Sequence, residues 1–190
     1  MIYRIHPEVK QFQRFALDAD EVEDKLGEDC LIYMDSQPTQ YKQLWQPIHI
    51  EFYRSVSSKT DNPVPDISCD QLGKLYLSLK AYNRLFTLLQ DHGEFLPVEH
   101  EDGTKAYLFN PLVLAEDLQA IDQEKTCFNE WDELERIAFI QVALKETPIF
   151  RTEVDCFQGI YCQERFKQLV EDSALQGLII TDNLHNQPPT

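Results

Sequence analysis

The sequence predicts an α+β fold, with a mostly antiparallel sheet and two strand-helix-strand units whose helices pack on the sheet. The main observation is a unit that occurs twice, at residues 75–98 and again 84 positions later at residues 159–182. Each copy contains an apolar strand, a helix-capping position, an amphipathic helix, a glycine and a second apolar strand. Each helix has one apolar stripe, which must be buried against a sheet.

The first copy has the clearer signals. Ser78 is a good N-cap, because its hydroxyl can accept from the free amides of the first helical turn. Gly93 is expected to end the helix in a left-handed conformation. In the second copy Cys162 occupies the cap position and Gly177 the stop. The residues expected to face the sheet are Leu79, Tyr82, Leu85, Phe86 and Leu89 in the first copy and Phe166, Leu169, Val170 and Ala174 in the second.

Further strands are predicted from alternation and from β-branched or aromatic residues. Asp102-Gly103 is the strongest hairpin signal and joins two strands at residues 95–99 and 106–109. The segment Arg136–Leu144 fits either a helix or a buried hairpin with the following IFRTEV, and the near-continuous apolar run favours the hairpin. The remaining candidate strands are Met1–Ile5, Cys30–Asp35, His49–Arg54 and Leu112–Ala115.

The chain length suits one domain, or one domain with an N-terminal extension. A proline-containing break at Asn62–Pro65 is the best internal boundary. It divides the chain into a variable N-terminal lobe at residues 1–64, a core domain at 65–182 and a polar tail at 183–190.

The charge balance is strongly acidic. There are 33 Asp and Glu residues against 17 Lys and Arg residues, so the net charge is −16. Such a field repels nucleic acid and anionic membranes and attracts basic partners. The start MIYRIHPEVK is not a secretory signal, and the longest apolar run is far too short to cross a membrane. The sequence therefore predicts a cytoplasmic protein.

Chemistry-bearing motifs are sparse. The five cysteines are scattered without a CxxC pair, which favours reduced thiols that fill core positions. Cys162, at a predicted helix start, is the one candidate for an activated thiol. The stretch DADEVED lacks the glycine of a calcium loop. No phosphate-binding glycine motif is present, and we expect no cofactor.

One segment is a candidate metal site. It crowds potential ligands onto one strand and turn, without the HExxH spacing of a known zinc motif. A metal-dependent hydrolase that uses the segment His92–Asp102 is therefore an alternative function. The potential ligands are His92, Glu94, Glu99, His100, Glu101 and Asp102.

A family resemblance carries the functional prediction. PIFRTEVDCFQGIYCQERFKQLVEDSALQGLIITD, at residues 148–182, resembles the C-terminal signature of immunity protein family eleven of bacterial polymorphic toxin systems. The upstream stretch at residues 75–122 also resembles the family, and the match covers about residues 65–182. The matching positions in the signature are Pro148, Ile149, Phe150, Arg151, Gly159, Ile160, Glu164, Phe166, Leu169, Leu175 and Gly177. Cys162 departs from the usual serine.

The resemblance implies a non-enzymatic immunity protein. Such a protein binds a cognate toxin effector delivered by secretion, for example type VI secretion, and protects the producing cell during bacterial competition. Occlusion of the toxin's active surface would be the mechanism, and the acidic field would suit a basic toxin. The candidate toxin-binding residues are Asp18, Asp20, Glu21, Glu23, Asp24, Glu101 and Asp102. A scaffold or adaptor without a toxin partner is a further alternative, and the oligomeric state is left open.

Overall fold

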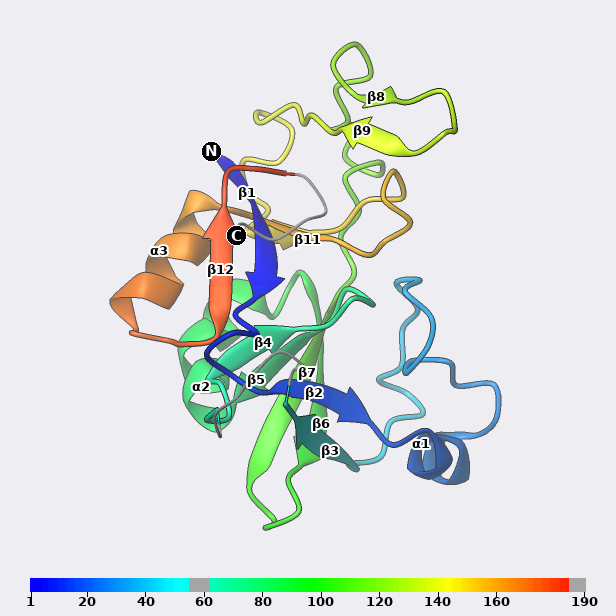
Figure 1. The fold of residues 1–190 in the computed structure, drawn as a ribbon, viewed down its shortest axis with the longest axis vertical. Coiled ribbons are helices and arrows are strands. Elements are labelled where there is room, and N and C mark those ends of the chain that lie inside the picture. Colours follow the sequence, from blue (N-terminus) through cyan, green and yellow to red (C-terminus); the bar gives the residue numbers. More distant parts are fainter. Residues whose placement is uncertain (55–61, 185–190) are drawn as a thin grey trace.

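The computed structural model describes residues 1–54 and 62–184 and confirms the α+β prediction (Figure 1). Within these residues, two main sheets and one small hairpin accompany three helices. The four-stranded sheet has the order β10 (Ile149–Phe150), β11 (Ile160–Gln163), β1 (Ile2–Pro7), β12 (Leu178–Thr181), and all its pairs are antiparallel. The helix α3 (Glu164–Asp172) connects β11 to β12.

The larger sheet has six strands, and it is antiparallel except where β3 pairs with β6. The helix α2 (Leu79–Leu89) connects β5 to β6, and α1 (Ala19–Leu26) lies between β2 and β3 in sequence. The strand order is β2 (Arg14–Leu17), β3 (Ile48–Tyr53), β6 (Gly93–Glu99), β7 (Lys105–Pro111), β5 (Leu75–Ser78), β4 (Ile67–Cys69). A separate hairpin is formed by β8 (Cys127–Phe128) and β9 (Leu134–Arg136).

The repeated unit is present in both sheets. In the larger sheet β4-β5-β7-β6 are neighbours, and in the smaller sheet β10-β11-β1-β12 follow the same order. In each unit a strand leads through a helix to a second strand, and one further strand pairs between the two. In the first unit this inserted strand is β7, which directly follows β6. In the second unit it is β1, from the opposite end of the chain.

The predicted displacement of 84 positions is wrong by one residue. The strands β5 and β11, the helices α2 and α3, and the strands β6 and β12 all begin 85 positions apart. The buried triplets Leu75–Leu77 and Ile160–Cys162 correspond, so Cys162 matches Leu77 in the core. The second cap position is Gln163, whose side chain makes no capping hydrogen bond. Ser78 caps α2 as predicted, its Oγ accepting from the Ala81 amide at 3.2 Å.

The two glycines do not end the helices as predicted. Gly93 is the first residue of β6, where a Cβ atom would lie 2.3 Å from the Asn110 carbonyl oxygen. Gly177 has φ +121°, and its Cβ would lie 2.2 Å from the carbonyl oxygen of Ile67. Both positions therefore need glycine because another backbone passes very close to them.

One apolar core joins the two sheets. It combines Ile5 and Ile160 of the smaller sheet with Leu77 of the larger sheet, and adds Leu85 from α2 and Phe166 from α3. The two helices lie against each other on one side of the molecule (Figure 1). Because β1 pairs in one sheet and β3 in the other, residues 1–54 are built into both sheets of the predicted core domain.

Three strand predictions are wrong. Residues 30–35 form a turn, with the amides of Met34 and Asp35 donating to the Leu31 carbonyl. Leu112–Ala115 contributes only an isolated bridge between Leu114 and Arg151. The predicted hairpin at Arg136–Leu144 does not form, because Ile149–Phe150 pairs with β11 instead. The apolar residues Ile137, Phe139 and Leu144 of that segment pack as loops against Phe150 and Tyr161.

Candidate functional site

Most of the acidic stretch at residues 18–29 folds as the helix α1, and residues 27–29 follow its end. Asp18 is its N-cap, and its Oδ1 accepts from the amides of Asp20 at 2.9 Å and Glu21 at 3.3 Å. Acidic side chains in the first turn also interact favourably with the positive end of the helix dipole. Val22 is fully buried and attaches the helix to the core. Asp18, one of the predicted toxin contacts, is exposed and also caps this helix.

Glu21 fixes α1 to the start of β3. Its carboxylate accepts from the amide and the ring Nδ1 of His49, both at 2.8 Å, and lies 2.7 Å from Lys25 Nζ. Lys25 also donates to the Pro47 carbonyl at 2.9 Å. Partial burial raises the pKa of Glu21, but the hydrogen bonds from Lys25 and His49 outweigh it, so the pKa is lowered overall. Glu21 stays ionised with its charge largely paired.

The other predicted acids of α1 are exposed at its outer surface. Glu23 accepts from the Tyr33 hydroxyl at 2.7 Å, which joins α1 to the following loop. This hydrogen bond to the Glu23 carboxylate raises the pKa of Tyr33. Asp20 and Asp24 are therefore the α1 acids best placed to meet a partner.

The second predicted acidic group, Glu101 and Asp102, lies at the exposed turn between β6 and β7, as the sequence indicated. Asp102 Oδ1 accepts from the Thr104 amide at 2.9 Å. Hydrogen bonds from Thr104 lower the pKa of Asp102. The turn is closed by a hydrogen bond from the Gly103 amide to the His100 carbonyl. The carboxylates at this tip are thus held by a formed turn.

The strand β3 connects the two acidic groups. His49, bonded to Glu21 of α1, lies opposite Glu99 in the β3–β6 pairing. Further along, the ring of Phe52 stacks on His100 with a centroid separation of 5.2 Å. Figure 1 shows α1 and the β6–β7 turn at the same end of the molecule. We name this surface the acidic margin; it comprises Asp18, Asp20, Glu21, Glu23, Asp24, Glu51, Glu99, Glu101 and Asp102.

Apolar side chains accompany the acidic margin. The loop from α1 to β3 exposes Met34 by 61%, Leu44 by 44% and Leu31 by 41%. Large apolar side chains beside charged ones are typical of protein interfaces, where the apolar groups supply affinity. The sequence prediction missed them as surface residues, because it placed Leu31 and Met34 in a strand at Cys30–Asp35 that does not form.

Two residues of the candidate metal segment, Glu94 and His100, make structural hydrogen bonds. Glu94 is 6% exposed and accepts from the amides of Tyr41 at 2.8 Å and Lys42 at 2.9 Å, and from Asn110 Nδ2 at 3.0 Å. His100 Nε2 lies 2.9 Å from the Tyr76 hydroxyl. Across residues 1–54 and 62–184, no three His, Cys, Asp or Glu side chains are grouped so that they could hold a metal ion.

Cys162, the candidate for an activated thiol, and Arg151 are both buried. Cys162 is inaccessible in β11, and its burial raises the thiol pKa, so it is not an activated thiol. Arg151, in the segment at residues 148–182, is fully buried and donates to the carbonyls of Ser36, Leu72 and Phe157. Arg151 therefore holds three separate segments together.

Comparisons with known proteins give no family for this chain. It matches no protein-family model, and no curated protein is significantly similar to it. Among the helices of the described residues, none is long and apolar enough to span a membrane.

Proposed function

We propose that the protein is a bacterial immunity protein that binds a cognate toxin effector in the cytoplasm and neutralises it by covering the toxin's active surface. The observation that carries the proposal is the acidic margin, with exposed carboxylates on α1 and on the β6–β7 turn, together with the apolar side chains Met34, Leu44 and Leu31 exposed on the loop that follows α1. The resemblance of residues 148–182 to an immunity family supports the same function.

The margin has the two properties that inhibition by occlusion requires. The backbone that carries its carboxylates is fixed by a capped helix and a closed turn, so little backbone entropy is lost on binding. The negative field would speed the approach of a basic toxin, and the apolar side chains would slow its release. An interface of ordinary size would bury about 1,600 Å² in total.

The first test uses the toxin encoded beside the gene. Cells that express this toxin should survive when the protein is co-expressed, and the two proteins should co-purify. Equal killing with and without the protein would refute the proposal. Co-purification with a non-toxic protein alone would favour a scaffold or adaptor, and tightly held stoichiometric metal would favour the hydrolase alternative.

The second test addresses the surface. We expect the double reversal Asp20→Lys and Asp24→Lys to slow association about tenfold at low salt, and much less at high salt. The matched control reverses the exposed acids Glu171 and Asp172 at the end of α3 and should change association less than threefold. Equal slowing by both double variants would mean that net charge, and not the acidic margin, drives binding.

A further inference from the structure

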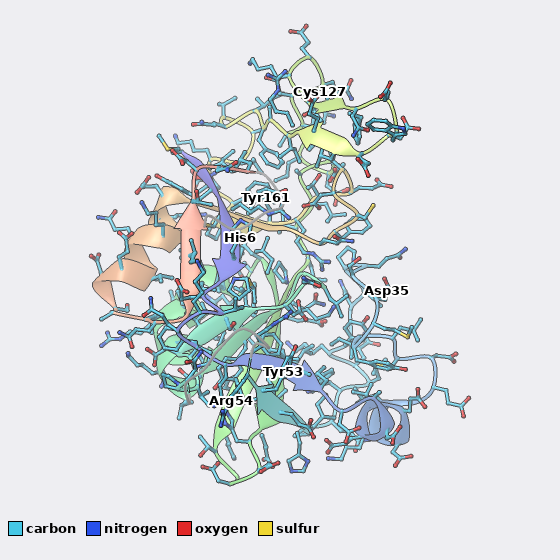
Figure 2. The ribbon with its side chains drawn as sticks, viewed as in Figure 1. His6, Asp35, Tyr53, Arg54, Cys127 and Tyr161 are labelled. Atoms are coloured by element: carbon cyan, nitrogen blue, oxygen red, sulfur yellow. The ribbon has the colours of Figure 1, made fainter. Side chains whose placement is uncertain are left out.

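The β8–β9 hairpin extends away from the main sheets at the end of the molecule opposite α1 (Figures 1 and 2). Its turn is held by one side chain. Asn129 Oδ1 accepts from the amides of Trp131 and Glu133, both at 2.9 Å, and Asn129 Nδ2 donates to Glu133 Oε2 at 2.8 Å. The tip is thus a formed structure that presents its side chains in fixed directions.

Large aromatic residues are exposed on this hairpin. Trp131 at the turn is 72% exposed, and Phe128 on β8 is 50% exposed. An exposed tryptophan on a preformed turn can bury a large apolar area at little entropic cost, which is why tryptophan is enriched among the residues that dominate binding energy.

A groove of about 380 Å³ lies where the hairpin meets the segment at residues 154–158. Phe128, Leu134, Ile137 and Val154 give it an apolar lining. Its charged lining is one-sided: Asp132, Glu133, Glu135 and Asp155 are acidic, and Arg136 is basic. Arg136 Nε is already used, because it donates to the Lys125 carbonyl at 2.8 Å.

Asp155 gives an independent indication of a ligand. Its side chain is 5% exposed and lines the groove. The Oδ2 atom accepts from the Tyr161 hydroxyl at 2.8 Å and the Gly159 amide at 3.0 Å, and lies 3.5 Å from Arg4. The Oδ1 atom finds no hydrogen-bond partner among the described residues. A buried carboxylate oxygen without a donor is costly, and a cationic donor would satisfy it.

We propose that this groove docks an arginine- or lysine-bearing segment of a protein partner, with Trp131 packing against the apolar residues beside the cation. The apolar lining suits the methylene stem of such a side chain, and the carboxylates suit its charged end. The inference does not depend on the acidic margin or on the partner being a toxin, since it rests on the groove and on Trp131 at the hairpin tip.

The test uses a defined probe, an acetylated hexapeptide of alternating leucine and arginine, titrated into the full-length protein and followed by amide NMR shifts. The amides of Phe128, Ile137 and Val154 should shift, and a leucine-glutamate peptide should leave them unchanged. The variant Trp131→Ala should weaken binding about tenfold. The double variant Asp132→Asn with Glu135→Gln should weaken it about fivefold.

A charge-matched control separates the groove from general attraction to an acidic protein. The double variant Glu171→Gln with Asp172→Asn removes two charges from the end of α3, outside both proposed binding surfaces, and should change the affinity less than twofold. The proposal is overturned if this control weakens binding as much as the groove variants do, or if the shifts fall outside the groove. Equal affinity of Trp131→Ala and the unmodified protein would also overturn it.

Discussion

His6 is a neutral imidazole held in the interior of β1. It is 5% exposed, and its Nε2 has no hydrogen-bond partner among the described residues. Burial, with a smaller effect from Arg4, lowers its pKa to about 4. Because the unfolded imidazole titrates near 6.5, the unfolded chain binds the extra proton first as the pH falls. Above pH 6.5 the imidazole is neutral in both states and does not change the free energy of unfolding. As the pH falls from 6.5 toward 4, the unfolded chain takes up the proton and the free energy of unfolding decreases.

The variant His6→Leu tests this dependence. Between pH 7 and pH 4.5 the unmodified protein should lose about 1–3 kcal/mol more free energy of unfolding than the variant, because only its imidazole gains a proton on unfolding. Carboxylate titration affects both proteins and cancels in the difference. Chemical denaturation at the two pH values gives the measurement, and parallel losses would show that His6 is not held neutral.

Lys74 makes the stability of the fold depend on pH in the alkaline range, whereas His6 does so in the acidic range. Its side chain is 1% exposed, and Nζ donates to the carbonyls of Asp35 at 2.9 Å and Leu72 at 3.1 Å. Burial lowers its pKa to about 8, although Asp70 partly offsets the shift. Above pH 8 the folded amine loses its proton, while the unfolded amine keeps it until about pH 10.5.

We therefore expect the unmodified protein to gain stability relative to Lys74→Met between pH 8 and 10.5. The relative gain should be about 1–3 kcal/mol in the free energy of unfolding, and denaturant titration across that range would measure it. A constant difference between the two proteins would mean that the buried amine titrates normally.

At the scale of elements, the capping of α1 can be tested separately from its charge. Asp18→Ala removes the acceptor for two amides and should cost about 1 kcal/mol, whereas Asp18→Asn should cost less because asparagine also caps well. Asp24→Ala removes the same charge from an exposed position and should change stability by less than about 0.5 kcal/mol. Thermal unfolding of the three variants would compare them.

The elements also show what local pattern can predict. Ser78 and the Asp102-Gly103 turn were predictable because capping and turn chemistry act over a few residues. The predicted stripe of α2 is right for Leu85 and Leu89 but wrong for Leu79 and Phe86, which are exposed, and in the second copy Ala174 is exposed beyond the end of α3. The alignment of the second unit with the first was not predictable in this way. Phe166 was aligned with Tyr82 because both are aromatic, whereas the residue of α2 that corresponds to the buried Phe166 is Ala81. At Arg136–Leu144 an apolar run was read as regular structure, but its residues pack as loops under Phe150 and Tyr161.

For the whole molecule, the shared core predicts that the two sheets unfold together. Ile5 on β1 is 3% exposed and lies in the core that also contains Leu77 and Leu85. Ile5→Ala should lower the free energy of unfolding by about 2–4 kcal/mol. Trp45, whose Nε1 donates to the Pro97 carbonyl of β6, reports on the larger sheet.

Fluorescence of Trp45 in a Trp131→Phe background gives the measurement. The Ile5→Ala substitution should shift the transition seen by Trp45, although Ile5 belongs to the smaller sheet. An unshifted Trp45 transition would show that the sheets unfold independently.

Long-range pairing limited the sequence prediction most strongly at this scale. Ile2 pairs with Gln163, and no local pattern indicates which of several short strands is its neighbour. The acids of α1 and the β6–β7 turn were predicted individually, but only β3 brings them to one margin. The groove at Asp155 depends on three segments and had no signal in the sequence.

The placement of β1 has a consequence for rearranging the gene. Residue Arg4 of β1 lies opposite Thr181 of β12, so a short tight linker from residue 182 back to residue 1 would copy the β6–β7 connection. In such a circular permutant, opened after Pro7, both units would have the same order along the chain. The first would be β5-α2-β6-β7 and the second β11-α3-β12-β1. The strand inserted in each unit would then come from residues close in sequence, and we expect the permutant to fold faster than the protein with its original chain order.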